Sequence, residues 1–192
     1  MSASPDKSAL RAELRRLRRR LQAETPDAAQ RAAAGLPLER LPAFTSFAGY
    51  QPQGSELDPA PLMARLAATG AVRALPAAFG WEEPLEFRAW APGAALEPDA
   101  FGIPAPPPEA EAVLPDVVIA PLLAFDRRGG RLGQGAGHYD RTLANLRRGR
   151  AVFVLGLAYA GQELAEIPME PHDQRLDAIL TETGYIAVAR AR

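Results

Sequence analysis

The chain lacks cysteine entirely and has only two histidines among its 192 residues. The first absence excludes disulfide bonds, cysteine nucleophiles and thiolate metal sites. The second argues against a zinc site built from several histidines. No run of about 18 consecutive apolar residues occurs, so no transmembrane helix is expected. Residues 1–21 are charged and lack the apolar segment of a secretory signal. These absences predict a cytoplasmic protein that does not enter a membrane.

A strong net charge is also absent. The 22 basic and 23 acidic residues leave a net charge of −1, which gives no general attraction to nucleic acid. Lysine is almost absent: Lys7 is the only lysine, and all other residues in this basic count are arginines. The compact ammonium of lysine reaches a phosphate from angles that the flat guanidinium of arginine does not fit. Lys7 is therefore a candidate functional residue. The alternative is that the composition simply favours arginine and that Lys7 has no special role.

The N-terminal segment predicts an amphipathic helix over residues 5–23, with Asp6 as a cap after Pro5. Its apolar face is a stripe of leucines at spacings of three and four: Leu10, Leu14, Leu17 and Leu21. The arginines of residues 15–20 are interpreted as a solvated face. An RNA-associated helix is the alternative, but the neutral net charge and the leucine stripe argue against it.

Apolar runs alternate with amphipathic segments along the rest of the chain. Residues 116–125 are almost all apolar, which is typical of a central strand buried on both faces, and residues 85–92 alternate as in a half-buried antiparallel strand. We expect further strands at 44–51, 72–78, 151–159 and twice near the C-terminus, and helices at 26–35, 58–70 and from 138. This order predicts one α/β domain over residues 1–192, a three-layer α/β/α sandwich with a mostly parallel central sheet and an N-terminal helix.

Two loops carry special compositions. Residues 92–115 are rich in proline, and such a segment forms either an extended connector or a long loop that crosses near a binding cleft. Residues 129–137 contain five of the 16 glycines and stand between an expected strand and an expected helix. Glycines, a helix N-terminus and nearby arginines are the parts of a phosphate-binding loop. The spacing matches neither the P-loop nor the dinucleotide fingerprint.

The segment "LAFDRRGGRLGQGAGHYDRTL" resembles the signature of the 5-formyltetrahydrofolate cyclo-ligase family. Three further segments are similar to that family's motifs in the same order: "KSALR", "YQPQGSELDP" and "LGLAYAGQELAEIPMEPHDQRLDAILTE". The resemblance therefore runs from end to end. It implies an ATP- and Mg²⁺-dependent enzyme that converts 5-formyltetrahydrofolate to 5,10-methenyltetrahydrofolate and releases ADP and phosphate. The formyl oxygen is phosphorylated first, and N10 of the folate then closes the ring.

The resemblance also implies roles for individual residues. Lys7, Arg131 and Tyr139 would act in catalysis, with core packing as the alternative for Tyr139. Asp140 and Asp173 would hold Mg²⁺. The ATP-binding residues would be Lys7, Arg11, Arg131, Gly133, Gly135, Ala136, Gly137, His138 and Tyr139. The folate-binding residues would be Tyr50, Glu56 and His138, with core packing as the alternative for Tyr50 and an exposed loop glutamate as the alternative for Glu56.

Several assignments stay open. Ala136 and His138 depart from the family's loop, and alanine fits there only with a negative φ. His138 would stack on folate, bind a phosphate or stay exposed. Asp177 would either face the same way as Asp173 or cap a helix or strand, and Asp126 is expected to form a turn.

The expected partners are ATP and a small-molecule folate, bound by a monomer without nucleic acid. A folate-binding paralogue without turnover is the alternative function. Such a paralogue would keep Glu56 and lose the ATP residues, whereas Lys7, Arg11, Arg131 and Asp140 are all present.

Overall fold

The computed structural model describes residues 7–189, and its centre is a seven-stranded sheet in the order β11-β10-β9-β6-β1-β2-β3. The pairings from β10 to β2 are all parallel, and the edge strands β3 and β11 are antiparallel. The strands are β1 (Ser46–Ala48), β2 (Val72–Ala77), β3 (Glu86–Ala89), β6 (Val117–Ala120), β9 (Phe153–Leu157), β10 (Ala178–Thr181) and β11 (Gly184–Ala187). The predicted α/β fold with a mostly parallel sheet is confirmed.

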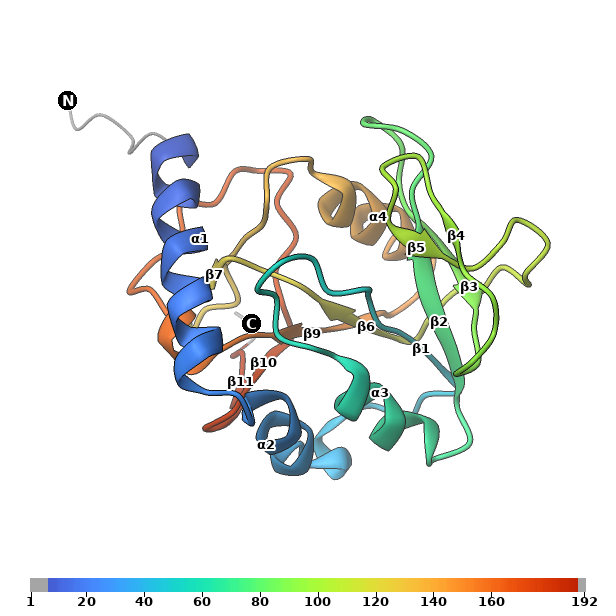
Figure 1. Ribbon diagram of the computed structural model, residues 1–192, viewed down its shortest axis with the longest axis horizontal. Helices are drawn as coiled ribbons and strands as arrows, with labels where there is room; N and C mark the ends of the chain where they lie inside the picture. Colours follow the sequence, from blue (N-terminus) through green and yellow to red (C-terminus); the bar gives the residue numbers. More distant parts are fainter. Residues whose placement is uncertain (1–6, 190–192) are drawn as a thin grey trace.

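Helices cover both faces of this sheet. Among the described residues the α-helices are α1 (Lys7–Glu24), α2 (Ala28–Gly35), α3 (Ala60–Ala67) and α4 (His138–Leu146), and two 3₁₀ turns are η1 (Leu38–Arg40) and η2 (Ala160–Gln162). In Figure 1, α2 and α3 lie below the sheet and α4 lies above it. Alternate strand residues point to opposite faces, so Ile119 packs with the α2–α3 core and Val118 with the α4 core.

Helix α1 packs at one side of the sheet (Figure 1). Leu14 is 3% exposed and joins a third apolar cluster with Leu123 and Ile167. Leu21 approaches η2 so closely that a Cβ on Gly161 would lie 2.7 Å from its Cδ2. The predicted leucine stripe therefore holds α1 against the body of the protein. The expected cap at Pro5–Asp6 lies outside the described residues.

The interpretation of residues 15–20 as a solvated face is wrong for Arg18. This side chain is buried, with 3% of the residue exposed. Residues four apart lie on the same side of a helix, so Arg18 follows Leu14 onto the inward face. Arg16 and Arg19 are exposed as expected.

The strand predicted over residues 116–125 is divided. Strand β6 ends at Ala120, before Pro121, which has no N–H to extend the ladder. The chain then forms a separate two-stranded hairpin, β7 (Ala124–Phe125) with β8 (Arg131–Leu132). Asp126 begins the hairpin turn, as predicted, since its Oδ1 accepts hydrogen bonds from the N–H groups of Arg128 and Gly130, each at 2.9 Å.

The proline-rich segment forms a small hairpin of β4 (Glu97–Pro98) and β5 (Pro104–Ala105), which rises beside β2 and β3 in Figure 1. Asp99 ties it to the end of β2, because its Oδ2 accepts a hydrogen bond from the N–H of Ala78 at 3.1 Å. This agrees with the crossing-loop interpretation. Within residues 7–189, no helix has the length and apolar character needed to span a membrane.

Candidate active site

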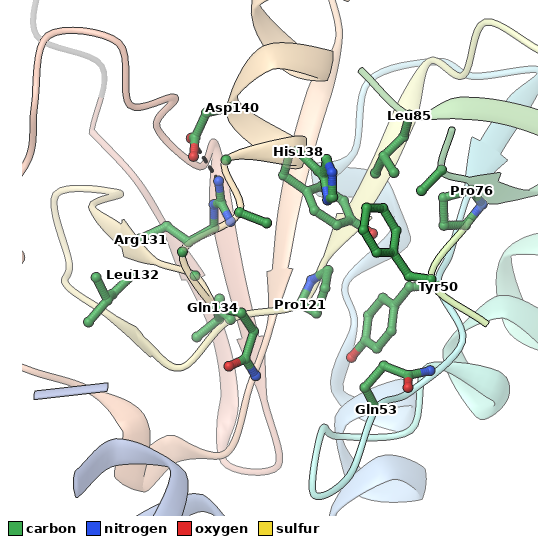
Figure 2. Close-up of a pocket in the computed structure, with 18 of the residues that line it drawn as sticks. Tyr50, Gln53, Pro76, Leu85, Pro121, Arg131, Leu132, Gln134, His138 and Asp140 are labelled. Carbon is green, nitrogen blue, oxygen red and sulfur yellow. Dashed lines mark hydrogen bonds and ion pairs between the residues drawn. The ribbon is translucent and has the colours of Figure 1, made fainter. Parts of the chain in front are cut away.

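A cleft of about 520 Å³ opens at the carboxyl ends of the central strands. Tyr50 follows β1, Ala78 follows β2 and Pro121 follows β6, and all three line it. Ligands of open α/β sheets bind at this end of the strands. Figure 2 shows two facing walls, with Arg131, Gln134 and Asp140 on one side and Tyr50 and Gln53 on the other.

Every residue that the sequence predicted for the site lines this one cleft. They are Lys7, Arg11, Tyr50, Glu56, Arg131, Gly133, Gly135, Ala136, Gly137, His138, Tyr139, Asp140 and Asp173. Segments from both ends of the chain and from its middle therefore meet at one place.

The glycine-rich loop leaves room for arginine side chains. Arg11 donates from Nε to the carbonyl of Gly133 at 3.0 Å, and a Cβ on Gly135, at φ +110°, would lie 3.3 Å from its guanidinium carbon. Gly137 adopts φ +70° just before α4, and a Cβ there would lie 2.7 Å from Nη1 of Arg141. Ala136 has a negative φ, because no non-glycine residue of the described chain has a positive one. The loop thus brings bare backbone and cationic side chains to the N-terminus of a helix.

Arg131 is the buried cation of this wall. It is 7% exposed, and its Nη2 donates to Oδ1 of Asp140 at 2.7 Å (Figure 2). Its guanidinium lies 5.7 Å from the ring centroid of Tyr139, within the range of a cation–π contact. The buried Nε has no hydrogen-bond partner among the described residues. A buried donor without a partner is costly, which marks this position as suited to an incoming acceptor.

Acidic side chains gather at one end of the cleft. Possible ligand atoms of Glu170, His172 and Asp173 lie within 4.8 Å of one another. Nζ of Lys7 lies 2.5 Å from Oε1 of Glu170, and this hydrogen bond is the main cause of a lowered pKa for Glu170. Glu170 and His172 were not predicted as site residues, although both lie inside the quoted C-terminal motif.

Asp140 and Asp173 both line the cleft, but Asp177 does not. Asp177 instead accepts hydrogen bonds at its Oδ2 from Arg147 and from the N–H of Val154, at 2.9 and 2.8 Å. It therefore ties the start of β9 to the end of α4, which agrees with the capping interpretation. The carboxylates that face the cleft are hard oxygen donors of the kind that Mg²⁺ prefers.

The opposite wall holds a buried carboxylate. Glu56 is 7% exposed, and its Oε2 accepts the N–H of Gln53 at 2.9 Å. Burial raises the pKa of Glu56, while the Gln53 hydrogen bond and the charge of Arg18 act in the opposite direction. Tyr50 beside it is 3% exposed and donates its hydroxyl to the carbonyl of Leu57. Its ring is therefore fixed in place.

Aromatic side chains line the mouth of the cleft. The rings of His138 and Phe101 lie 5.2 Å apart, and Trp81 meets Phe101 edge-on at 4.8 Å. Nε2 of His138 lies 2.9 Å from the carbonyl oxygen of Gly80, so this nitrogen carries the hydrogen. Trp81 is 70% exposed. Phe101 and Trp81 were not predicted from the sequence. Phe101 lies in the proline-rich hairpin and Trp81 in the loop after β2, and the composition of neither segment shows that it returns to the cleft.

Comparison with known proteins shows the family of the chain. A model of the 5-formyltetrahydrofolate cyclo-ligase family matches residues 3–182. The chain belongs to this family. A 5-formyltetrahydrofolate cyclo-ligase of Mycolicibacterium smegmatis is 38% identical over 148 residues, which cover 72% of this chain and 75% of that one. The enzyme of the same name from Escherichia coli K12 is 36% identical over 143 residues, again covering 72% and 75%.

Two solved structures have the same fold, and the first agrees with the family assignment. The NMR structure of Aquifex aeolicus 5,10-methenyltetrahydrofolate synthetase is 28% identical, with a TM-score of 0.77 over 97% of this chain and 94% of that one. A synthetase from Mycoplasma pneumoniae, 22% identical with a TM-score of 0.70, covers 92% of this chain and has the same fold. Cyclo-ligases of this family are ATP-dependent ligases of folate one-carbon metabolism.

Proposed function

We propose that the cleft binds ATP and 5-formyltetrahydrofolate side by side and that the protein converts the folate there to 5,10-methenyltetrahydrofolate. One observation carries this proposal: a cationic glycine-loop wall and a wall with a buried carboxylate face each other across a single cavity. The first wall suits phosphates and the second suits the N–H groups of a pterin. The whole chain, residues 1–192, would act as one domain, as a monomer in the cytoplasm, on small molecules alone.

The proposed ATP site lies between α1 and the glycine-rich loop. Lys7 and Arg11 are four residues apart on α1, so both face the cleft. With Arg131 they supply three cations for the triphosphate. Phosphoryl transfer depends mainly on such positioning and charge neutralisation. The N–H groups of residues 133–139 at the start of α4 add donors and the positive end of the helix dipole.

The proposed magnesium site is formed by Asp140 and Asp173. Magnesium commonly takes one or two protein carboxylates together with substrate phosphates. The ion would neutralise the phosphates and orient them. Glu170 is a further carboxylate beside Asp173 and stands in the same wall.

The proposed folate site lies between Glu56 and the aromatic mouth. The Glu56 carboxylate would accept hydrogen bonds from pterin N–H groups in a buried setting, where such bonds are strong. Tyr50 would pack against the pterin, and His138 would lie against its other side. Nε2 of His138 is directed at the carbonyl oxygen of Gly80, so a contact of this ring with the substrates would use its face or Nδ1.

The chemistry proposed at this site has two steps. The formyl oxygen attacks the γ-phosphorus of ATP, and the bond to the β-phosphate oxygen breaks to release ADP. N10 then attacks the activated formyl carbon, the phosphate leaves with the former formyl oxygen, and N10 loses its proton. Lys7 and Arg131 would stabilise charge on the transferred group. Burial raises the pKa of Tyr139, so its hydroxyl stays protonated and would donate a hydrogen bond.

A spectrophotometric assay tests the proposal. The protein with ATP, Mg²⁺ and 5-formyltetrahydrofolate should produce the absorbance of methenyltetrahydrofolate only when ATP is present. Lys7→Ala should raise the KM for ATP about tenfold or more, as expected for loss of a charge-assisted phosphate contact, and Arg19→Ala, an exposed change on the same helix, should not. Folate binding without any ATP-dependent product would instead support the paralogue without turnover.

A further inference from the structure

Arg18 is a buried cation beside the cleft that the proposed chemistry does not use. Its residue exposure is 3%, and it is not among the residues that line the cavity. Burying a guanidinium is costly unless its donors are satisfied. An arginine in this position, one turn after Leu14 on a helix with several exposed arginines, therefore needs a specific reason.

The guanidinium of Arg18 connects three segments of the chain. Nε donates to Oγ of Ser55 at 3.1 Å, and Nη1 donates to the carbonyl of Leu122 at 3.2 Å. Nη1 also lies 3.5 Å from Oε1 of Glu56. Arg18 thus links α1, the loop after β1 and the segment after β6.

The loop that carries Glu56 has no regular secondary structure. It folds on itself: the N–H of Glu56 donates to the carbonyl of Gln53 at 3.2 Å, and the N–H of Gln53 donates to Oε2 of Glu56 at 2.9 Å. The Leu122 carbonyl that Arg18 shares is itself fixed by Nε2 of Gln162 at 3.0 Å. One carboxylate oxygen of Glu56 is therefore held by the loop and the other faces the arginine.

The electrostatics of Glu56 depend on this arginine. Burial raises the pKa of the Glu56 carboxyl, and Arg18 is one of the groups that lower it. The other titratable groups near Glu56 are the hydroxyls of Tyr50 and Tyr139, whose own pKa values are raised by burial and by the Glu56 charge. Arg18 is thus the cation that faces a carboxylate otherwise surrounded by neutral side chains.

We propose that Arg18 is a positioning residue for folate: its guanidinium holds the Glu56 carboxylate ionised and aimed into the cleft. This inference rests on the proposed function, which assigns Glu56 to the pterin. Arg18 itself touches no substrate. Its effect passes through Glu56, so it should change folate binding and leave ATP binding unchanged.

The test compares Arg18→Gln and Arg18→Lys with the exposed control Arg19→Gln. We expect Arg18→Gln to weaken 5-formyltetrahydrofolate binding about tenfold near neutral pH, in line with the loss of one hydrogen bond between charged groups. The loss should shrink as pH rises, because an uncompensated Glu56 regains its charge only at higher pH. Arg18→Lys keeps a positive charge without the planar guanidinium and its several donors. The pH dependence of folate affinity in this variant should therefore return toward that of the wild type.

A double mutant separates positioning from packing. In a Glu56→Gln background, Arg18→Gln should cost less than about twofold further in folate affinity, because residues that act through one another are not additive. Calorimetric titration with folate and with ATP, alongside melting temperatures, supplies the readouts. If Arg18→Gln does not fold, Arg18→Lys and the double mutant carry the test.

The outcomes distinguish the two proposals. A wild-type protein that produces no ATP-dependent methenyltetrahydrofolate overturns the proposed function. An active wild type whose Arg18 variants bind folate normally at every pH, or lose folate and ATP affinity equally, overturns the role given to Arg18. Additive losses in the double mutant overturn it as well.

Discussion

Nζ of Lys7 lies 2.5 Å from Oε1 of Glu170, a residue near the opposite end of the chain. The two side chains are partly exposed, at 24% and 49%, and ion pairs of this kind are weak in water. Lys7 therefore faces the cleft with a carboxylate partner that a phosphate can replace at small cost. The pair also joins the N-terminal helix to the acidic end of the cleft.

Glu170→Gln tests whether an ATP phosphate replaces the Glu170 carboxylate as the partner of Lys7. Without the carboxylate, Lys7 is released, and ATP measured in the absence of Mg²⁺ should bind about threefold more tightly, in line with the small value of an exposed ion pair. Glu166→Gln is the control, because Glu166 pairs with Arg128 and does not line the cleft. Isothermal titration with ATP measures both. Weaker ATP binding by Glu170→Gln without metal would contradict the exchange.

Gly137→Ala should damage both stability and ATP binding. Gly137 has φ +70°, and an added Cβ would lie 2.7 Å from Nη1 of Arg141. A left-handed backbone costs an alanine about 1–2 kcal/mol, and the displaced arginine would open the loop. Gly149→Ala is the matched control, since its Cβ would meet no atom within 4 Å and its φ is not positive. Urea unfolding and ATP titration should show a loss for the first variant only. Equal stabilities would argue against the loop geometry.

The quoted motifs were enough to predict which residues share the cleft. Each motif has a fixed place at a strand end or helix start, and parallel strands bring their carboxyl ends to one edge of the sheet. The resemblance to the family placed Lys7, Glu56 and Asp173 in one site without their distances, and the sheet topology agrees with it for the motifs that follow strands. The end of strand β6 before Pro121 was also predictable, because proline has no N–H for the ladder. The continuous apolar run of residues 116–125 instead led to the prediction of a single strand.

Arg18 and Phe101 could not be found in this way. The spacing of Arg18 from Leu14 and Leu21 places it beside the leucine stripe, but a long charged side chain at such a position ordinarily reaches solvent, and only the packing of α1 shows that it is buried. Phe101 lies in a proline-rich segment whose path is set by tertiary contacts such as the Asp99 hydrogen bond to Ala78. The positions of both side chains are set by tertiary packing, which the periodicity of the sequence does not show.

Asp116 gives a prediction for pH dependence. Burial acts to raise its pKa, but hydrogen bonds from Thr45 and Ser46 and the charge of Arg150 outweigh that effect and lower it. Oδ2 of Asp116 lies 2.9 Å from the N of Thr45, and Oδ1 pairs with Arg150. A carboxyl with a lowered pKa in the folded state stabilises the protein above its unfolded pKa, and this stability is lost as pH falls through the folded pKa.

We therefore expect Asp116→Asn to lower the free energy of unfolding by about 1–3 kcal/mol at neutral pH. The difference from wild type should shrink below about pH 4, the ordinary range for this side chain. Asp27→Asn, an exposed change with 64% of the side chain accessible, serves as the control. Urea unfolding across this pH range checks the sign. A difference that grows on acidification would contradict the assigned ion pair.

Asp173 and Asp177 allow a matched comparison for the proposed magnesium site. They are four residues apart in the sequence, but their side chains lie in different environments. Asp173 lines the cleft, whereas Asp177 accepts hydrogen bonds from Arg147 and Val154. Asp173→Asn should raise the Mg²⁺ concentration for half-maximal activity roughly tenfold, a typical cost of disturbing a metal's ligand set. Asp177→Asn should lower the melting temperature and leave that concentration unchanged. Magnesium titrations of the ATP-dependent rate measure both, and an identical magnesium requirement in the two variants would remove Asp173 from the site.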